Sequence, residues 1–220
     1  MGTLGWSALG ALAWSASEYA IHRFVGHGPL RSRATTLRER LTPAGLAAEF
    51  NVEHVAHHAD PTYFAPTSHK AAAAAVAVPA VSAALAPFVG ARQAFAFALG
   101  LSSTYLAYEL LHRRIHTHGP TGPYSRWMRR HHLHHHHRTP RANHGVTSPL
   151  WDAALGTLEP PARVRVPRAA APPWMIDPRT GALRADLATD YELVGVVRPA
   201  HDAATQGDAA VSDASAVRGS

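Results

Sequence analysis

Three stretches of the chain are apolar over about the length of a membrane-spanning helix. They are residues 3–21, 71–90 and 93–111. The second stretch carries no charged residue and the third carries only Glu109, and about 20 such residues suffice to cross the hydrocarbon core of a bilayer. Only Ala91 and Arg92 separate the second stretch from the third. The pattern therefore predicts a first apolar helix followed by a helical hairpin that crosses a membrane and returns.

Two other interpretations of these stretches remain open. Residues 3–21 have the length of a secretory signal peptide, but no basic segment precedes them and they run directly into a histidine-containing sequence. The hairpin is rich in alanine, which is only a weak membrane residue, so it also fits a buried hairpin of a soluble protein. The charge distribution along the chain favours the membrane interpretation.

Basic residues gather on one side of the predicted hairpin. The sequence before residue 22 has no lysine or arginine, and the tip between the two apolar arms has only Arg92. Because cytoplasmic segments carry the excess of positive charge, both basic regions are expected on the cytoplasmic side. The net charge of +6 does not indicate nucleic-acid binding, since the chain has no groove-reading motif. The basic residues in question are Arg23, Arg31, Arg33, Arg38, Arg40 and Lys70 before the hairpin, and Arg113, Arg114, Arg126, Arg129, Arg130, Arg138 and Arg141 after it.

The remaining pattern divides the chain into two parts. We predict a membrane domain over residues 1–160, with a short surface helix within residues 28–45 between glycine and proline breaks. From about Pro160 the composition shifts to proline, alanine, arginine and aspartate, which predicts a cytoplasmic tail over residues 161–220 that is partly disordered. Within it, residues 191–197 have the composition of a strand without an evident partner, and disorder is expected after Pro199. The expected fold class is an all-α, integral-membrane helical bundle with a cytoplasmic histidine-rich cap.

Histidine is the residue that the chain uses in excess. There are 17 histidines and no cysteine in 220 residues, so any metal site must use nitrogen and oxygen ligands. Ten of the histidines fall into four spaced clusters, which exceeds the four to six ligands that one ion takes and suits two ions held close together. These candidate metal ligands are His22 and His27 (H-x4-H), His54, His57 and His58 (H-x2-H-H), His112 and His116 (H-x3-H), and His132, His135 and His136 (H-x2-H-H).

Helical spacing predicts how each cluster is arranged. Residues three and four apart share one face of a helix, so each H-x2-H-H cluster is expected to point one way. His22 and His27 lie about 140° apart around an α-helix, so they converge only if the helix ends between them, and Gly26 supplies such an ending. The run over residues 131–137 also resembles a purification tag or a low-complexity metal buffer, although the other clusters are spaced. Among the remaining histidines we expect His118, His134 and His144 nearest to the site.

With these clusters in place, the chain resembles the fatty acid hydroxylase / sterol desaturase superfamily of membrane-bound di-iron oxidases. The sequences that carry the resemblance are EYAIHRFVGH from residue 18, HVAHHADP from residue 54, YELLHRRIHTHG from residue 108 and RRHHLHHHHRTPRANHGVTSPLWDAALGT from residue 129. The resemblance covers roughly residues 5–160. It includes the order and spacing of all four clusters and the closing segment GVTSPLWDAALGT, in which Trp151 and Asp152 are expected to be structural.

The resemblance implies an oxidoreductase that uses dioxygen and a metal centre. It implies two iron ions held by the ten clustered histidines, for which zinc can substitute, a lipid substrate of the fatty acyl or sterol type, and an external electron donor of the reductase or ferredoxin type. A lipid desaturase or a carotenoid hydroxylase of the same superfamily remains open, as does a non-enzymatic histidine-rich metal protein. Glu18, Glu53, Asp60 and Glu109 are candidates to orient the imidazole N–H groups. No catalytic residue beyond the metal ligands is expected.

Overall fold

The computed structural model describes residues 1–195 of the chain, and the predicted disordered tail after Pro199 lies outside the described residues. The described part is mostly helical, with a π-helix over Ile21–Gly26 and a single pair of short strands. Short 3-10 helices cover Arg168–Ala170, Pro173–Met175 and Ala185–Leu187. The other elements are α1 (Thr3–Ala20), α2 (Leu37–Arg40), α3 (Pro43–Ala59), α4 (Thr67–Val89), α5 (Ala91–Thr117), α6 (Pro123–His137), α7 (Leu150–Ala154), β1 (Val164–Pro167) and β2 (Tyr191–Val194).

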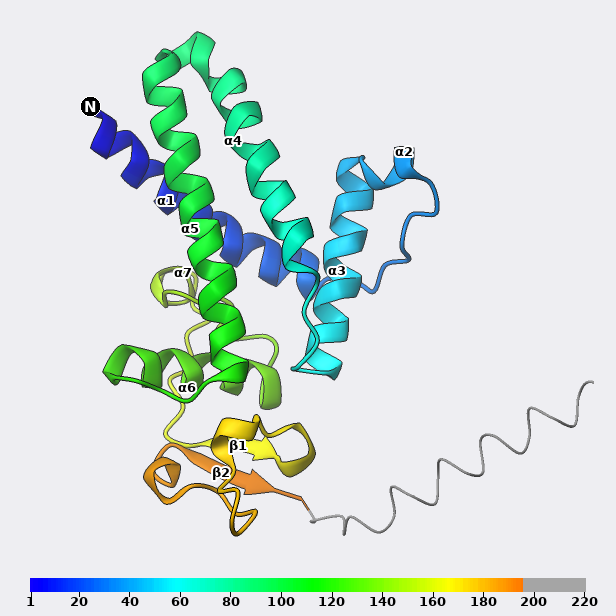
Figure 1. The fold of residues 1–220 in the computed structure, drawn as a ribbon, viewed down its shortest axis with the longest axis vertical. Helices are drawn as coiled ribbons and strands as arrows, with labels where there is room; N and C mark the ends of the chain where they lie inside the picture. The colour runs from blue at the N-terminus through cyan, green and yellow to red at the C-terminus, as the bar shows by residue number, and fades with distance from the viewer. Residues whose placement is uncertain (196–220) are drawn as a thin grey trace, which may run out of the picture.

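The predicted hairpin is formed by α4 and α5, which lie side by side and meet at a tight turn at Gly90 (Figure 1). Of the described helices, two are long and apolar enough to cross a membrane: Lys70–Val89, with a mean hydropathy of 2.0, and Ala91–Thr117, with a mean hydropathy of 1.3. The helix predicted over residues 3–21 forms as α1 and continues into the π-helix. It is not among those two, so its insertion in a membrane stays a prediction.

Helix α1 crosses α5 at a point where both backbones come very close. A Cβ atom on Gly10 would lie 2.1 Å from the carbonyl oxygen of Phe97, and one on Gly100 would lie 2.0 Å from that of Ser7. The hydroxyl of Ser7 donates to the carbonyl of Ala96 at 3.0 Å. Small residues at a helix crossing are typical of packing between membrane helices, where close backbone approach replaces the hydrophobic driving force. The crossing fixes α1 against α5 and so positions the residues that follow α1.

The strand expected near residue 191 has a partner that the sequence did not reveal. Strand β2 pairs in parallel with β1, with Val164 opposite Tyr191. Val164, Val166 and Tyr191 of the strands form one hydrophobic cluster of fully or nearly fully buried side chains together with Ile115, Met128 and Leu133. Residues 164–194 therefore pack against α6 and support the helix that carries three of the clustered histidines. The division at residue 160 stays a prediction.

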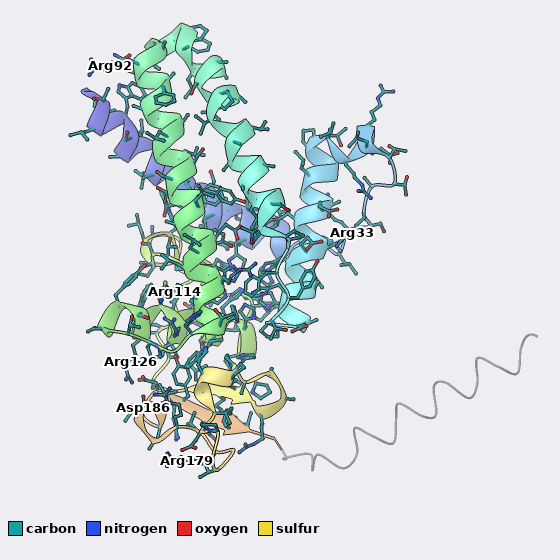
Figure 2. The ribbon with its side chains drawn as sticks, in the orientation of Figure 1. Arg33, Arg92, Arg114, Arg126, Arg179 and Asp186 are labelled. Atoms are coloured by element: carbon teal, nitrogen blue, oxygen red, sulfur yellow. The ribbon has the colours of Figure 1, made fainter. Side chains whose placement is uncertain are left out.

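The arginine side chains are distributed unevenly along the molecule. Figure 2 shows Arg92 at the tip of the α4–α5 hairpin, whereas Arg114 and Arg126 lie at the opposite end, near α6. This agrees with the asymmetry predicted from the sequence. It gives a hairpin with one nearly uncharged end and one basic end.

Candidate metal centre

The ten clustered histidines come together at the basic end of the hairpin and form two groups of five. Within each group, one nitrogen or oxygen ligand atom per residue lies within 4.8 Å of all the others. Group A, as we call it, draws on the π-helix, α3 and α6; group B draws on α3, α5 and α6. The members of group A are His22, His27, His54, His58 and His135, and those of group B are His57, His112, His116, His132 and His136.

Both H-x2-H-H clusters are split between the two groups, which differs from the prediction that each would point one way. His54 and His58 belong to group A and His57 to group B, while His132 and His136 belong to group B and His135 to group A. The physical reason is that position i+4 is turned about 40° from position i around the helix, whereas position i+3 is turned about 60° in the opposite direction. The groups adjoin each other, because the rings of His58 and His136 stack with centroids 4.1 Å apart.

His22 and His27 converge through a π-helix and not through an early helix ending. The π-helix runs over Ile21–Gly26, and the backbone N–H of His27 donates to the carbonyl of His22 at 3.1 Å. Because the π-helical hydrogen bond spans five residues, positions five apart come to the same side, where an α-helix would separate them. The two ring centroids are 5.1 Å apart as a result.

Asn51 and Gly26 support this segment; sequence reasoning did not identify Asn51, and it assigned Gly26 the different role of a helix ending. The fully buried amide of Asn51 donates to the carbonyls of Val25 at 2.8 Å and Gly26 at 3.1 Å, and its oxygen accepts from the N–H of Arg31. A Cβ atom at Gly26 would lie 2.8 Å from Cδ2 of His54. Both features serve the close approach of the π-helix to α3. The glycine is visible in the sequence HRFVGHG, but nothing in that sequence predicts that Gly26 contacts His54 of α3.

Backbone carbonyls, and not carboxylates, orient three of the imidazoles. Nδ1–H of His22 donates to the carbonyl of His144 at 2.5 Å, that of His57 to Tyr63 at 2.9 Å and that of His135 to Ala142 at 2.7 Å. A carbonyl oxygen only accepts, so the proton of each neutral ring lies on Nδ1 and the lone pair on Nε2 faces the group. This is the tautomer that a metal-ligating histidine needs.

The prediction that Glu18, Glu53, Asp60 and Glu109 orient the imidazoles is wrong for the described contacts. Glu18 accepts from the backbone N–H of Val146 and Thr147, and Asp60 accepts from Thr62. Glu53 accepts from Arg33 and from the Tyr63 hydroxyl, and Glu109 from Lys70. These carboxylates accept hydrogen bonds from nearby loops and cationic side chains, whereas backbone carbonyls accept from the imidazole rings.

The spacing of the ring nitrogens fits metal ions. The Nε2 atoms of His57 and His112 are 3.0 Å apart, as are those of His112 and His132. In group A, the Nε2 atom of His135 lies 2.9 Å from that of His27. An ion with nitrogen ligands at about 2.1 Å, as known for zinc, separates ligands at right angles by about 3.0 Å. Since His57 and His135 each hold their proton on Nδ1, their Nε2 lone pairs meet other ring nitrogens, and a cation between them makes this arrangement favourable.

Burial keeps these rings neutral, as metal ligation requires. Loss of solvation lowers the pKa of His57 to about 4 and that of His58 to about 3. It also lowers the pKa of His27 to about 4, with a further contribution from the neighbouring His144. At neutral pH the three rings are therefore uncharged, with lone pairs available to a cation.

Asp152 anchors the loop that carries His144, in keeping with the structural role expected of it. Its fully buried carboxylate accepts from the backbone N–H of His144 and of Gly145, both at 2.8 Å, and from the hydroxyl of Thr157 at 2.7 Å. Burial alone would raise the pKa of Asp152, but hydrogen bonds from His131 and these donors outweigh it, so the pKa is lowered. The carboxylate therefore fixes the carbonyl of His144 against His22.

Of the three further histidines expected near the site, only His144 lies there. Its ring centroid is 5.5 Å from those of His22 and His135. His118 is exposed and its Nδ1 lies beside the hydroxyl of Thr117, while His134 faces Glu159. His118 follows the end of α5 in extended conformation, and His134 occupies a position of α6 between those that face the two groups, so neither side chain reaches the site.

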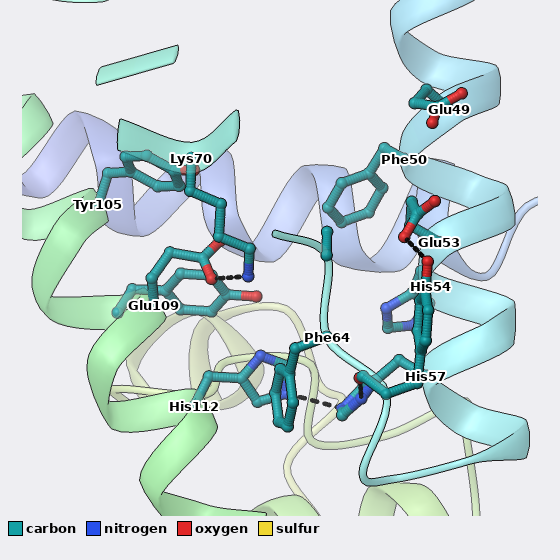
Figure 3. A pocket seen from close by; sticks show the side chains of 13 residues that line it. Glu49, Phe50, Glu53, His54, His57, Phe64, Lys70, Tyr105, Glu109 and His112 are labelled. Carbon is teal, nitrogen blue, oxygen red and sulfur yellow. Dashed lines mark hydrogen bonds and ion pairs between the residues drawn. The ribbon is translucent and has the colours of Figure 1, made fainter. Parts of the chain in front are cut away.

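A cavity of about 210 Å³ opens beside the two groups (Figure 3). His54 of group A and His57 and His112 of group B line one side of it. Its other sides are the aromatic rings of Phe50, Phe64, Tyr105 and Tyr108 and a polar rim that includes the ion pair of Lys70 with Glu109. A second cavity of about 150 Å³, lined by Trp14 and Ile21, shares Phe50, Tyr105, Tyr108 and Glu109 with the first. The space therefore continues from the histidines towards α1.

The chain is similar in sequence to proteins that are named as hydroxylases. The chain is 29% identical over 156 residues to a dihydroceramide fatty acyl 2-hydroxylase, FAH2, of Arabidopsis thaliana, an alignment that covers 69% of this chain and 59% of the relative. It is 30% identical over 159 residues to a fatty acid 2-hydroxylase of Rattus norvegicus, covering 71% of this chain and 40% of that protein. The chain thus spans about 59% of the length of the plant relative.

The fold has a counterpart among solved structures. The structure described as full length scs7p, in which only the hydroxylase domain is visible, superimposes with a TM-score of 0.53 at 25% identity, over 74% of this chain and 58% of that chain. The family model for fatty acid hydroxylases matches residues 7–157, which include all ten clustered histidines. The resemblance inferred from the sequence is confirmed, and the chain belongs to the fatty acid hydroxylase family.

Proposed function

We propose that the chain is a membrane-bound di-iron oxygenase that hydroxylates a C–H bond of a fatty acyl lipid with dioxygen. The observation that supports this most directly is the pair of adjoining five-imidazole groups beside an aromatic-lined cavity. The plant and rodent relatives are named as 2-hydroxylases. We therefore propose the carbon next to the acyl carbonyl as the position that is oxidised.

In this proposal all ten clustered histidines are metal ligands, five to each ion. When bound, the two iron ions supply dioxygen activation and the oxidation of an unreactive C–H bond. One oxygen atom enters the lipid and the other leaves as water, which consumes two electrons and two protons. An external electron donor must supply those electrons. Zinc can occupy the same imidazoles without supporting the reaction, since it has no redox chemistry.

The protein residues around the site position the lipid and exclude water. Phe50, Phe64 and Tyr105 give the cavity walls to which an acyl chain binds by apolar contact. The carbonyls of Tyr63, Ala142 and His144 hold three imidazoles in a fixed orientation before any ion binds. With the α4–α5 hairpin in the membrane and the arginine-rich end on the cytoplasmic side, the lipid enters from the bilayer and the donor approaches from the cytoplasm.

The test compares His57→Ala with His118→Ala. His57 belongs to group B and lines the cavity, whereas His118 is exposed and belongs to neither group. The two variants and the wild type are expressed separately. For each protein, the iron content per chain and the dioxygen consumption with a reductase are measured, and 2-hydroxylated acyl chains are quantified by mass spectrometry. We expect His57→Ala to lose iron and product together and His118→Ala to keep both.

Two results would contradict the proposal. Full hydroxylation by an iron-depleted His57→Ala variant would show that the imidazole groups are not the oxidising centre. Metal binding without dioxygen consumption under any donor would favour a non-enzymatic metal protein. An alkene product would instead assign a desaturase of the same family.

A further inference from the structure

A third cavity lies outside the metal centre, at the junction of α5 and α6. Its volume is about 530 Å³, and none of its lining residues belongs to either histidine group. Ala107, Leu110 and Leu111 of α5 form one wall, and Arg114, Tyr124 and Arg129 form the other end. Leu110 is 65% exposed. The cavity is therefore apolar at one end, basic at the other, and separate from the proposed substrate space.

The apolar wall and the basic end lie on one face of α5. Ala107, Leu110, Leu111 and Arg114 follow the spacing i, i+3, i+4 and i+7, which places their side chains in one stripe. In Figure 1, α6 lies across the end of α5, so the stripe runs towards the α5–α6 junction. Such a stripe changes from hydrocarbon-like to charged within two helical turns. A phospholipid changes in the same order, from an apolar acyl chain to a charged headgroup.

The basic end holds a buried cation whose charge no described carboxylate balances. Arg129 is 2% exposed, and its guanidinium donates to the carbonyls of His118 at 2.7 Å, Arg114 at 2.8 Å and Ser125 at 3.0 Å. Within residues 1–195, no carboxylate oxygen lies within 4.0 Å of the side-chain nitrogens of Arg129 or Arg114. Burial and the nearby Arg114 both lower the pKa of Arg129.

Two neighbouring arginines on α6 are balanced by a carboxylate, as arginines in proteins usually are. Arg126 pairs with Asp190 at 2.5 Å, and Arg130 pairs with the same carboxylate at 3.5 Å. Buried charges in proteins are normally paired in this way, since an unbalanced buried charge is costly. The cavity between Arg114 and Arg129 is thus a place where an anion from outside the chain would be stabilised.

The position of the cavity in the fold indicates which kind of molecule carries the anion. Figure 2 shows Arg114 at the end of the hairpin opposite Arg92. Tyr124 lines the cavity, and its ring stacks on that of Trp127 with centroids 5.8 Å apart. Aromatic side chains of this kind gather at the membrane interface. With α5 in a bilayer, which rests on the proposed function, the cavity opens at the level of the lipid headgroups.

We propose that this cavity binds one acidic phospholipid, with the phosphate between Arg114 and Arg129 and an acyl chain along Ala107, Leu110 and Leu111. A zwitterionic lipid also has a phosphate, but its ammonium group would approach the same arginines and be repelled. The bound lipid fastens α6 to α5. Since α6 carries His132, His135 and His136, the lipid stabilises the helix that contributes to both histidine groups.

The test uses the full chain purified in detergent and two lipids with identical acyl chains, phosphatidylglycerol and phosphatidylcholine. Bound lipid is counted by native mass spectrometry, and the melting temperature is measured at each lipid concentration. We expect phosphatidylglycerol to bind more tightly and to raise the melting temperature. Arg114→Gln should weaken its binding about fivefold, as expected for one basic residue at a membrane surface. Arg179→Gln, at an exposed position between the 3-10 helices Pro173–Met175 and Ala185–Leu187, should bind as the wild type does.

A second variant and a soluble anion make the test decisive. Leu110→Glu places a negative charge on the exposed apolar wall and should weaken binding of phosphatidylglycerol more than binding of phosphatidylcholine. Equal binding of the two lipids by the wild type, or undiminished phosphatidylglycerol binding by both variants, would overturn the proposal. So would a shift of the melting temperature by glycerol 3-phosphate as large as that caused by the lipid. The iron content is measured on the same samples. Normal iron content without selective lipid binding would contradict the lipid site alone, whereas absent iron would contradict the proposed oxygenase function.

Discussion

Replacement of Gly26 by alanine tests how tightly the π-helix holds group A. A Cβ atom at this position would lie 2.8 Å from Cδ2 of His54, whereas ordinary contact begins at 3.4 Å, so the imidazole must retreat by about 0.6 Å. Metal sites tolerate ligand displacements of only about 0.5 Å. Changes to groups that orient a metal ligand typically cost 10–100-fold in metal affinity. We therefore expect Gly26→Ala to weaken metal binding by about 10–100-fold at group A and to leave group B unchanged.

The assay is metal content per chain during titration with a chelator, followed by elemental analysis. The wild type should release its metal over one range of chelator concentration, and Gly26→Ala should release half of it at a concentration at least about tenfold lower. Gly2→Ala is the matched control, because no atom lies within 4 Å of the added Cβ. If Gly26→Ala and Gly2→Ala release metal alike, the close contact with His54 does not control ligand geometry and the reasoning is refuted.

Two further substitutions test the supports of the site. Asp152→Asn removes acceptors from the loop at His144, and we expect a loss of about 1–3 kcal/mol in the free energy of unfolding at pH 7. Because the pKa of Asp152 is lowered from 3.8, the wild-type advantage should be complete above pH 3.8 and disappear as the pH falls through the lowered value; a difference that persists at lower pH would argue against the carboxylate. Asn51→Ala leaves the carbonyls of Val25 and Gly26 without their donor, so we expect a similar loss of about 1–3 kcal/mol together with faster hydrogen exchange at His27; an unchanged melting temperature and exchange rate would show that Asn51 does not hold the π-helix.

The spacing of the histidines was enough to predict the candidate site, because helical periodicity relates sequence positions to faces directly. It was not enough to assign each imidazole to a group. His57 and His58 are adjacent in sequence but point about 100° apart on α3, and only the positions of α5 and the π-helix show that each meets a different set of partners. The π-helix could not be predicted either, since the amide that donates to its carbonyls belongs to Asn51, which lies 25 residues from Gly26 in sequence.

The orienting groups around the imidazoles illustrate a second limit. Acidic side chains near histidine clusters were the natural candidates, but the carbonyls of Tyr63, Ala142 and His144 take that role. Every residue has a carbonyl, so nothing in a sequence distinguishes the ones that do this. The short strand β1 was missed for a related reason, because four residues ending in Pro167 carry little strand signal without their partner β2.

Each of the helices α3 and α6 carries ligands of both groups on consecutive residues, His57 with His58 and His135 with His136. A rigid-body shift or rotation of either helix therefore changes the coordination of both proposed ions in the same instant. The two proposed ions can be affected separately only by a substitution that displaces an imidazole of one group. Gly26→Ala does this through its contact with His54 of group A. Under the proposed function, a lipid that displaces α3 from the cavity side would alter the ligands of both ions at once, so the two proposed ions would respond to the substrate as a single unit.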